Sequence, residues 1–198
     1  PTATSGIRNN LAFESLSFSH DRSQVITATE NALLQDGPSA STSASSPVRV
    51  LILDTQTGQP GAEYIYRTEP IAADPVPADG FATNGLVELL VLNKYSMLAL
   101  ERSFSVGIGN SIKLFLTSTK GATNVRSKDS IDGKHVRPLR KHLILDLDQL
   151  GITLDNIEGM TFGPDYADGS KSLILVSDNN FSDTQFTQFL AFRLYVNH

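Results

Sequence analysis

Six carboxylates lie at corresponding positions in three similar stretches of the chain. Acids that recur at such a spacing could bind a metal ion or take part in catalysis. Each stretch begins with a short apolar run whose second residue is a glutamate: FESLSF from Phe13, VELLVL from Val87 and IEGMTF from Ile157. A second acid ends the next apolar run in each stretch. The six acids are Glu14, Glu30, Glu88, Glu101, Glu158 and Asp178.

Carboxylates that crowd together raise one another's pKa unless a cation or an arginine compensates their charge. Calcium takes several oxygen ligands from Asp, Glu, Asn and backbone carbonyls. A bound cation can polarise a phosphate or ester oxygen and activate water. We therefore expect a metal site for calcium among all six acids, with Glu88, Glu158 and Asp178 also acting as catalytic residues. The alternative is structural, with each glutamate hydrogen-bonding the backbone of a neighbouring unit.

Polar residues that directly follow the second acids are expected to lie at the same place and to bind a substrate. An arginine supplies a positive charge there, and the asparagine amides supply hydrogen-bond donors and acceptors. These predicted substrate-binding residues are Asn31, Arg102, Asn179 and Asn180.

The acids need strands to position them. The three glutamates are 74 and 70 residues apart, and each apolar run is followed by a turn rich in Asp, Asn, Gly or Pro and then by a second apolar run. Such runs bounded by turn residues are typical of β-hairpins. In an antiparallel hairpin the start of the first strand lies beside the end of the second. The expected neighbours are Glu14 with Glu30, Glu88 with Glu101, and Glu158 with Asp178.

Further strands follow each hairpin, and no amphipathic helix is convincing. A third strand is expected from Val48, Ile112 and Gln188, and a fourth from Ala62 and His142. Four antiparallel strands paired in sequence order form a β-propeller blade. We therefore predict an all-β fold, a β-propeller with about three blades in residues 1–198 as a single domain. A sandwich or barrel with similar hairpins is the alternative.

Known propellers have about four or more blades. We therefore expect the missing blades to come from upstream sequence or from another chain, so that this domain is the C-terminal part of a larger propeller. The first residue, Pro1, fits a chain that was processed or cut from something longer.

Composition narrows the function classes. The formal net charge of −5 argues against nucleic-acid binding, and no apolar run is long enough for a membrane span. The chain has no cysteine, so a thiolate site is excluded. Residues 36–47 are low in complexity and are expected to form a flexible loop, and the basic stretch 120–142 a solvated one. The histidines have no metal-ligand spacing and are expected at the surface: His20, His135, His142 and His198.

Several motifs together resemble one known family. The stretches NNLAFESLSFSHD, NGLVELLVLNKYSMLALERSF, DNIEGMTFGP and SLILVSDNN are similar to the phytase-like domain family described as having esterase-like activity of phytase. The resemblance runs from about Asn9 to Leu194, with a departure at Ser15, where the family pattern has glycine after the glutamate.

The resemblance implies a β-propeller, usually exported, so we expect an extracellular or periplasmic protein. It also implies a phosphoester or ester hydrolase acting on a small phosphorylated or ester substrate. Propeller phytases bind phosphate through calcium held by rim carboxylates, and the acids above are compatible with that arrangement. We therefore expect calcium-assisted hydrolysis at an acidic channel mouth. The alternative function is a non-catalytic propeller module that binds a partner or a carbohydrate.

Overall fold

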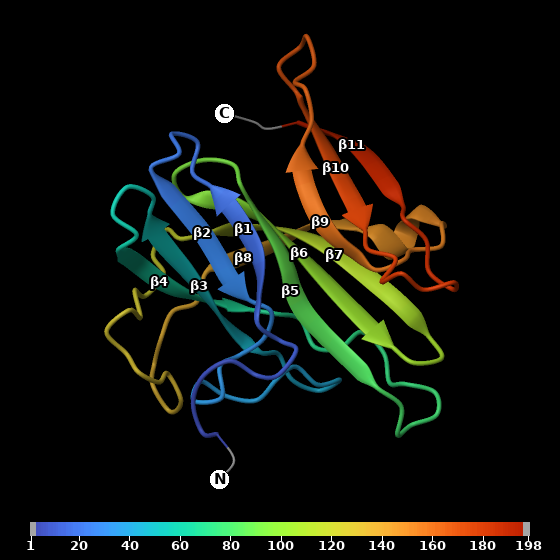
Figure 1. Ribbon diagram of the computed structural model, residues 1–198, viewed down its shortest axis with the longest axis horizontal. Helices are drawn as coiled ribbons and strands as arrows, with labels where there is room; N and C mark the ends of the chain where they lie inside the picture. Colours follow the sequence, from blue (N-terminus) through green and yellow to red (C-terminus); the bar gives the residue numbers. More distant parts are fainter. Residues whose placement is uncertain (1–2, 196–198) are drawn as a thin grey trace.

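The computed structural model describes residues 3–195 and is built almost entirely of antiparallel strands (Figure 1). Three sheets follow one another along the chain. Sheet 1 contains β1 (Phe13–Phe18), β2 (Gln24–Thr29), β3 (Pro47–Asp54) and β4 (Pro60–Arg67). Sheet 2 contains β5 (Ala82–Val91), β6 (Ser96–Ser105), β7 (Gly109–Ser118) and β8 (Arg140–Asp146). Sheet 3 contains β9 (Ile157–Phe162), β10 (Lys171–Ser177) and β11 (Phe189–Leu194), and the short 3-10 helix η1 (Leu147–Leu150) precedes it.

Each strand pairs with the strand that follows it in sequence, in every sheet. The predicted all-β class and the antiparallel order of the strands are therefore confirmed. No sheet closes on itself within the described residues, so the propeller ring stays a prediction. No helix in residues 3–195 is long and apolar enough to cross a membrane.

Local hydrogen bonds explain why the chain turns where it does. In the β1–β2 turn, Asp21 Oδ1 accepts hydrogen bonds from the Ser19 hydroxyl at 2.7 Å and from the Ser23 backbone at 3.1 Å. In the β5–β6 turn, Asn93 Oδ1 accepts from the backbone N–H groups of Tyr95 and Ser96. Asp and Asn side chains stabilise reversals in this way, and they set the ends of the two hairpins.

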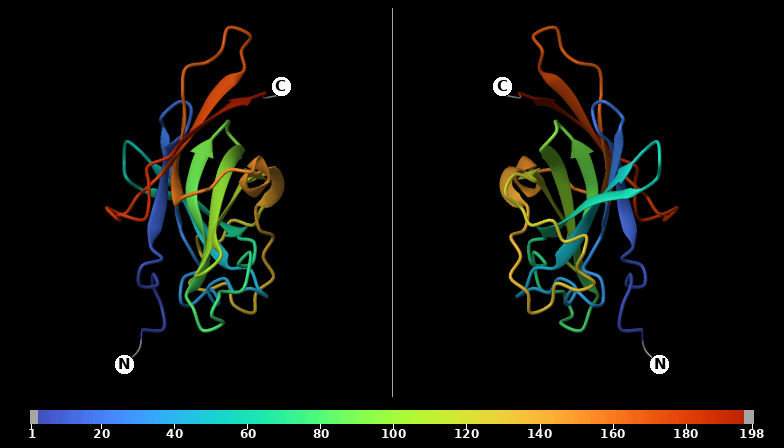
Figure 2. Two further views of the ribbon diagram at one scale, coloured as in Figure 1. Left: turned by 90° about the vertical axis from the view of Figure 1, so that its right-hand side faces the viewer. Right: turned by 90° about the vertical axis from the view of Figure 1, so that its left-hand side faces the viewer.

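Sheet 2 lies between the other two sheets, and both of its faces are covered (Figures 1 and 2). One apolar core joins it to sheet 1, and another joins it to sheet 3. The first core includes Ile26, Val50, Leu89, Ala99 and Phe115, and the second includes Leu98, Leu114, Met160, Leu173 and Leu175. The first strands approach one another, β1 against β5 and β5 against β9.

The opposite face of sheet 1 is open at β1. Leu16 and Phe18 alternate along this strand with the buried Ser15 and Ser17, and they are 67% and 55% exposed. Sheet 2 therefore covers the face of β1 that carries the two serines, and the larger apolar side chains on the other face are exposed to solvent.

The basic stretch between β7 and β8 is packed, in contrast to the expected solvated loop. Its Val125 and Ile131 are buried against Ile65 of β4. Val125 N donates to the Glu63 carbonyl at 2.8 Å, so the loop also satisfies backbone groups of the outer strand β4. A loop that covers an edge strand protects it from pairing with other chains.

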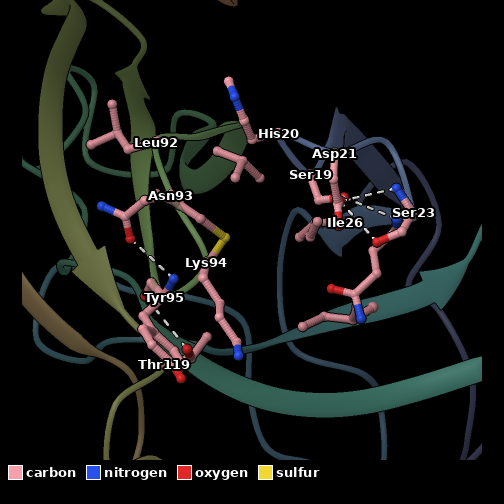
Figure 3. Close-up of a pocket in the computed structure, with 14 residues that line it drawn as sticks. Ser19, His20, Asp21, Ser23, Ile26, Leu92, Asn93, Lys94, Tyr95 and Thr119 are labelled. Atoms are coloured by element: carbon pink, nitrogen blue, oxygen red, sulfur yellow. Dashed lines mark hydrogen bonds between the residues drawn. The ribbon is translucent and has the colours of Figure 1, made fainter.

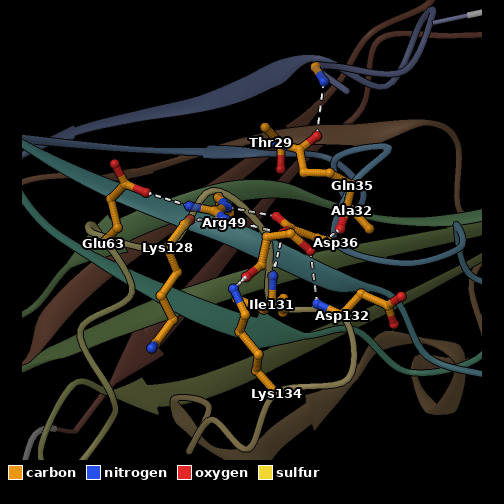
Figure 4. Close-up of polar contacts among 12 residues, drawn as sticks. Thr29, Ala32, Gln35, Asp36, Arg49, Glu63, Lys128, Ile131, Asp132 and Lys134 are labelled. Atoms are coloured by element: carbon orange, nitrogen blue, oxygen red, sulfur yellow. Dashed lines mark hydrogen bonds and ion pairs between the residues drawn. The ribbon is translucent and has the colours of Figure 1, made fainter. Parts of the chain in front are cut away.

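Residues 36–47 are fastened at both ends. The buried Asp36 carboxylate accepts hydrogen bonds from Arg49 and from the backbone of Ile131 (Figure 4). At the other end, Ser46 Oγ accepts from Ala32 N at 2.9 Å. The segment is thus a loop with anchored ends, and the flexibility of the part between them stays a prediction.

Candidate functional site

Each first strand contains one extra residue near its start. In sheet 1, Phe13 pairs with Thr29 and Ser15 pairs with Ala28, so Glu14 has no partner across the ladder. Such an insertion is a β-bulge, which turns the local side chains relative to the rest of the strand. The register leaves Glu158 unpaired in sheet 3 in the same way.

In sheet 2 the unpaired residue is Val87, because Leu86 pairs with Glu101 and Glu88 pairs with Leu100. The residue that corresponds to Glu14 and Glu158 is therefore Val87. The predicted equivalence of Glu88 with the other two glutamates is wrong by one residue.

The same shift changes the second acids. Glu30 N donates to the Ala12 carbonyl beyond the bulge of sheet 1, and Asp178 N donates to the Asn156 carbonyl in sheet 3. The residue at the corresponding place in sheet 2 is Arg102, which pairs with Gly85. The position at the end of the second strand is thus occupied by Glu30 in sheet 1, by Arg102 in sheet 2 and by Asp178 in sheet 3.

This arrangement gathers four charged residues from the three sheets, which we name the Arg102 cluster: Glu14, Glu30, Arg102 and Glu158. Arg102 Nη2 lies 2.9 Å from Glu158 Oε1 and 3.7 Å from Glu30 Oε1. Glu14 is close enough to Glu158 for their charges to interact. One guanidinium therefore faces three carboxylates, which leaves an excess of negative charge when all of them are ionised.

Burial dominates the electrostatics of the Arg102 cluster. The Glu30 side chain is only 4% exposed, and burial raises its pKa to about 7, although Arg102 acts in the opposite direction. Burial and the charge of Glu158 also raise the pKa of Glu14. Glu30 therefore changes its protonation state near neutral pH, as groups poised for proton transfer do.

The guanidinium is incompletely satisfied. Arg102 Nε is buried and finds no hydrogen-bond acceptor among residues 3–195. A buried polar atom without a partner in a native structure calls for an explanation such as a missing ligand or water.

Arg102 also lines a pocket of about 490 Å³, which we name the Arg102 pocket. Its walls come from sheet 2, from the segment before β9 and from the loop between β10 and β11. The amide-bearing residues that line it are Asn110, Asn156, Asn180 and Gln185, and the aromatic ones are Phe104 and Phe186. A concave site with a few convergent polar groups is typical of small-molecule binding.

Glu101 does not join the other acids, and its expected place among them is wrong. Successive side chains of a strand point to opposite faces, so Glu101 faces sheet 1 when Arg102 faces the cluster. Its carboxylate accepts hydrogen bonds from the Tyr66 hydroxyl at 2.5 Å, from Glu69 N at 2.7 Å and from Lys141 Nζ at 2.6 Å. The bond from Tyr66 of β4 joins sheet 1 to sheet 2, and the bond from Lys141 of β8 lies within sheet 2.

Glu88 and Asp178 also lie outside the Arg102 cluster. Glu88 Oε1 accepts from Leu89 N at 2.8 Å, and burial raises the pKa of Glu88 to about 7, partly offset by the backbone N–H groups of Leu89 and Leu16. Because Leu16 belongs to β1, Glu88 helps to join β5 to β1, as the structural alternative expects. The exposed Asp178 carboxylate accepts from Asn180 N at 2.9 Å.

The predicted substrate-binding residues divide in two. Arg102 and Asn180 line the Arg102 pocket. Asn31 is buried, and its side chain bonds to the backbone of Asn84 and Ala40. The Asn179 side chain accepts from Phe181 N at 3.1 Å in its own turn. Only the first pair therefore faces space that a ligand could occupy.

The geometry does not fit the expected calcium site. Among residues 3–195 there is no group of three or more His, Cys, Asp or Glu side chains placed to hold a metal ion. Where acids do approach one another, the Arg102 guanidinium supplies the positive charge in their midst. The described histidines lie on a turn, a loop and β8, apart from the cluster, and His198 lies outside the described residues.

One functional position escaped the sequence analysis. Asp155 lies in the wall of the Arg102 pocket and holds the loop after β10, since its carboxylate accepts from Phe186 N at 2.6 Å and from Gln185 Nε2 at 3.0 Å. The signal that could have found it is the Asp–Asn pair directly before IEGM, where an acid precedes a first strand.

The chain matches a known family profile. The profile of a phytase-like family, described as "esterase-like activity of phytase", matches residues 1–181. No curated protein matches the chain.

Proposed function

Because the chain belongs to the phytase-like family, we propose that it is a hydrolase of phosphoesters or related esters that acts at the Arg102 pocket. The observation that carries the proposal is the guanidinium of Arg102, which lines this pocket and contacts acids from two other sheets. Arginine binds the oxygens of phosphate in a planar, bidentate geometry. Asn180 and Gln185 are placed to hold the rest of a substrate.

The acids of the Arg102 cluster have separate tasks in this proposal. Glu30, with its pKa raised to about 7, lies next to Arg102 and outside the pocket lining, so its protonation lowers the negative charge beside the guanidinium and favours a phosphate there. Glu158 becomes free to accept a proton from water once a phosphate replaces it at Arg102. Glu14 adds to the negative charge of the cluster when it is ionised.

Activity should therefore rise as the pH falls through about 7. With Glu30 protonated, the cluster carries one negative charge less and repels a phosphate less. When all three acids are ionised, the cluster carries a net charge of about −2 and repels the substrate. An activity that increases steadily from pH 6 to pH 8 would contradict this arrangement.

The test is hydrolysis of p-nitrophenyl phosphate, and of p-nitrophenyl acetate for the ester alternative, by the purified protein. Arg102→Met should lower kcat/KM by about 100-fold or more, as the loss of a transition-state donor does. Arg193→Met is the matched control, since Arg193 is an exposed arginine bound to Asp168 on sheet 3. Equal activity of the Arg102→Met variant and the wild type would refute the proposed site.

Calcium belongs to the same experiment. Activity that needs calcium and disappears with a chelator would support the calcium-assisted form that the sequence predicts. Activity that is indifferent to calcium and chelator would support the arginine-centred form.

A non-catalytic carbohydrate-binding module is the second candidate, because amide and aromatic side chains line the Arg102 pocket. Such a lining suits neutral polyols, which take many hydrogen bonds and stack on rings. Isothermal titration with myo-inositol and glucose, in protein that hydrolyses neither p-nitrophenyl ester, separates this candidate from the first. Binding without turnover would favour it.

A further inference from the structure

A second pocket, of about 620 Å³, lies at the other end of the strands, between the β1–β2 turn and the β5–β6 turn (Figure 3). We name it the turn pocket. It is separate from the Arg102 pocket, which lies where β2 and β6 end. Neither the family description nor the proposed function uses it.

The floor of the turn pocket is apolar and comes from two sheets. Ile26 and Ile52 belong to sheet 1, and Val91 and Met97 belong to sheet 2. Leu92 extends the apolar surface up one wall. The volume lies in the range of small-molecule sites, which are mainly apolar with a few placed polar groups.

The walls of the turn pocket are held in place before any ligand arrives. Asp21 accepts hydrogen bonds from both the side chain and the backbone of Ser23, as well as from Ser19. These bonds lower the pKa of Asp21 to about 2, so the carboxylate is ionised at neutral pH and keeps the turn in one conformation. Asn93 fixes the facing turn through Tyr95 N and Ser96 N. A preformed site loses little entropy on binding.

Positive charge lies at one wall of the turn pocket and beside it. Lys94 lines the pocket, whereas Lys120 follows the lining residue Thr119 and is not itself part of the lining. Lys94 Nζ lies 5.4 Å from the centre of the Tyr95 ring, and Lys120 Nζ lies 5.1 Å from the centre of the same ring. Neither lysine forms an ion pair with an acid within residues 3–195. The two ammonium groups therefore make this side of the apolar floor favourable for an anionic group.

We propose that the turn pocket binds an amphipathic anion, whose apolar or aromatic body lies on the Ile26–Met97 floor and whose carboxylate or phosphate group meets Lys94 and Lys120. Asp21 is ionised and belongs to the facing β1–β2 turn, so its negative charge favours an anionic group that lies on the lysine side of the turn pocket, away from Asp21. Both parts of the ligand contribute to binding here.

The first test is a fluorescence titration with 8-anilinonaphthalene-1-sulfonate, an aromatic anion. The wild type should bind one equivalent, and the double variant Lys94→Gln/Lys120→Gln should bind at least 10-fold more weakly. Lys171→Gln is the matched control, because Lys171 also lies over a ring, that of Phe162 at 5.6 Å, but on sheet 3. N-phenyl-1-naphthylamine, which lacks the sulfonate, should bind both proteins equally.

The second test locates the probe and identifies the anionic group. Amide NMR shifts caused by the probe should fall in residues 19–26 and 91–97. Shifts confined to the open β1 face around Leu16 and Phe18 would overturn the proposal, as would unchanged binding in the double-lysine variant. Decanoate and decyl phosphate should displace the probe, and their relative affinities distinguish a carboxylate from a phosphate ligand. Equal displacement by decanol would refute the role of the lysines.

Discussion

Arg49 and Arg102 both contact carboxylates, but they differ in how many of their N–H groups have partners. The difference distinguishes an arginine that holds the fold together from one that can bind a ligand. Arg49 Nε lies 2.6 Å from Asp36, Nη1 lies 2.9 Å from Glu63, and Nη2 donates to the Lys128 carbonyl at 2.8 Å (Figure 4). Hydrogen bonding to Asp36 is the main cause that raises the pKa of Arg49. Arg102, in contrast, has one close acid and a buried Nε without an acceptor.

The comparison teaches that a binding site is indicated less by which charged residues meet than by whether all of their hydrogen-bonding groups have partners. A fully bonded ionic network holds segments together, as Arg49 holds β3 to the 36–47 loop and to the segment before β8. A network in which some donors have no acceptor can still bind a ligand, and the pKa values of its members are shifted. Glu30, whose pKa is raised to about 7, marks the second kind.

Breaking the Arg49 network should have the largest effect on stability. Arg49→Met leaves the Asp36 carboxylate buried and unpaired, which costs about 3–5 kcal/mol of unfolding free energy. Arg102→Met should cost less than about 2 kcal/mol at pH 6, because the neighbouring Glu30, whose pKa is raised to about 7, is protonated there and needs no counter-charge. Urea denaturation of both variants measures the difference, and equal losses would break the distinction between the two arginines.

Part of the pH dependence of stability should come from Glu30 of the Arg102 cluster. The pKa of Glu30 is about 7 in the folded state and 4.5 in its unperturbed state, so the folded protein binds the proton more tightly. This contribution is complete below about pH 4.5 and is lost as the pH rises through 7, in all on the order of 3 kcal/mol. Glu30→Gln should flatten the loss of stability between pH 5 and pH 8.

Two controls accompany that measurement. Glu88→Gln should remove a second part of the same slope, since the pKa of Glu88 is also about 7. Asp36→Asn should lower stability, because it weakens the ion pair with Arg49. A stability that is constant between pH 5 and pH 8 in the wild type would contradict the buried, protonated state of Glu30.

A glycine beside Arg102 gives a smaller expected change than the Arg49 network does. A Cβ at Gly85 would collide with the Glu30 side chain. Gly85→Ala should therefore displace the Glu30 carboxylate, cost about 1–3 kcal/mol and weaken the pH dependence. Thermal unfolding at pH 5 and pH 8 measures both effects. Gly169→Ala is the control, since a Cβ there meets no atom but is strained by its positive φ, and it should leave the pH dependence intact.

The sequence predicted the hairpins well, because apolar runs and turn residues determine them locally. It also predicted that Arg102 and Asn180 face a common space. It failed at the bulges, since a single inserted residue changes which side chains share a face while leaving the apolar pattern readable. For that reason the sequence pattern places Glu101 at the position that Arg102 takes in the structure. It also aligns Glu88 with Glu14, whereas the residue that corresponds to Glu14 is Val87.

The packing of the basic stretch could not be predicted either. Its charges suggested solvent, but Val125 and Ile131 bury against a strand of another sheet, and that depends on how the sheets stack. The anchor of the 36–47 loop at Asp36 likewise depends on a residue far along the chain, Ile131.

The loop between β7 and β8 has a consequence for how the molecule comes apart. It leaves sheet 2, bonds to β4 of sheet 1 through Val125 and Leu139, and returns to sheet 2. The loop thus connects sheets 1 and 2 through backbone hydrogen bonds, so the two sheets should unfold together as one cooperative unit. Sheet 3, which shares only its inner face, should open first. Amide hydrogen exchange should therefore be fastest in β10 and β11 and slowest in β6.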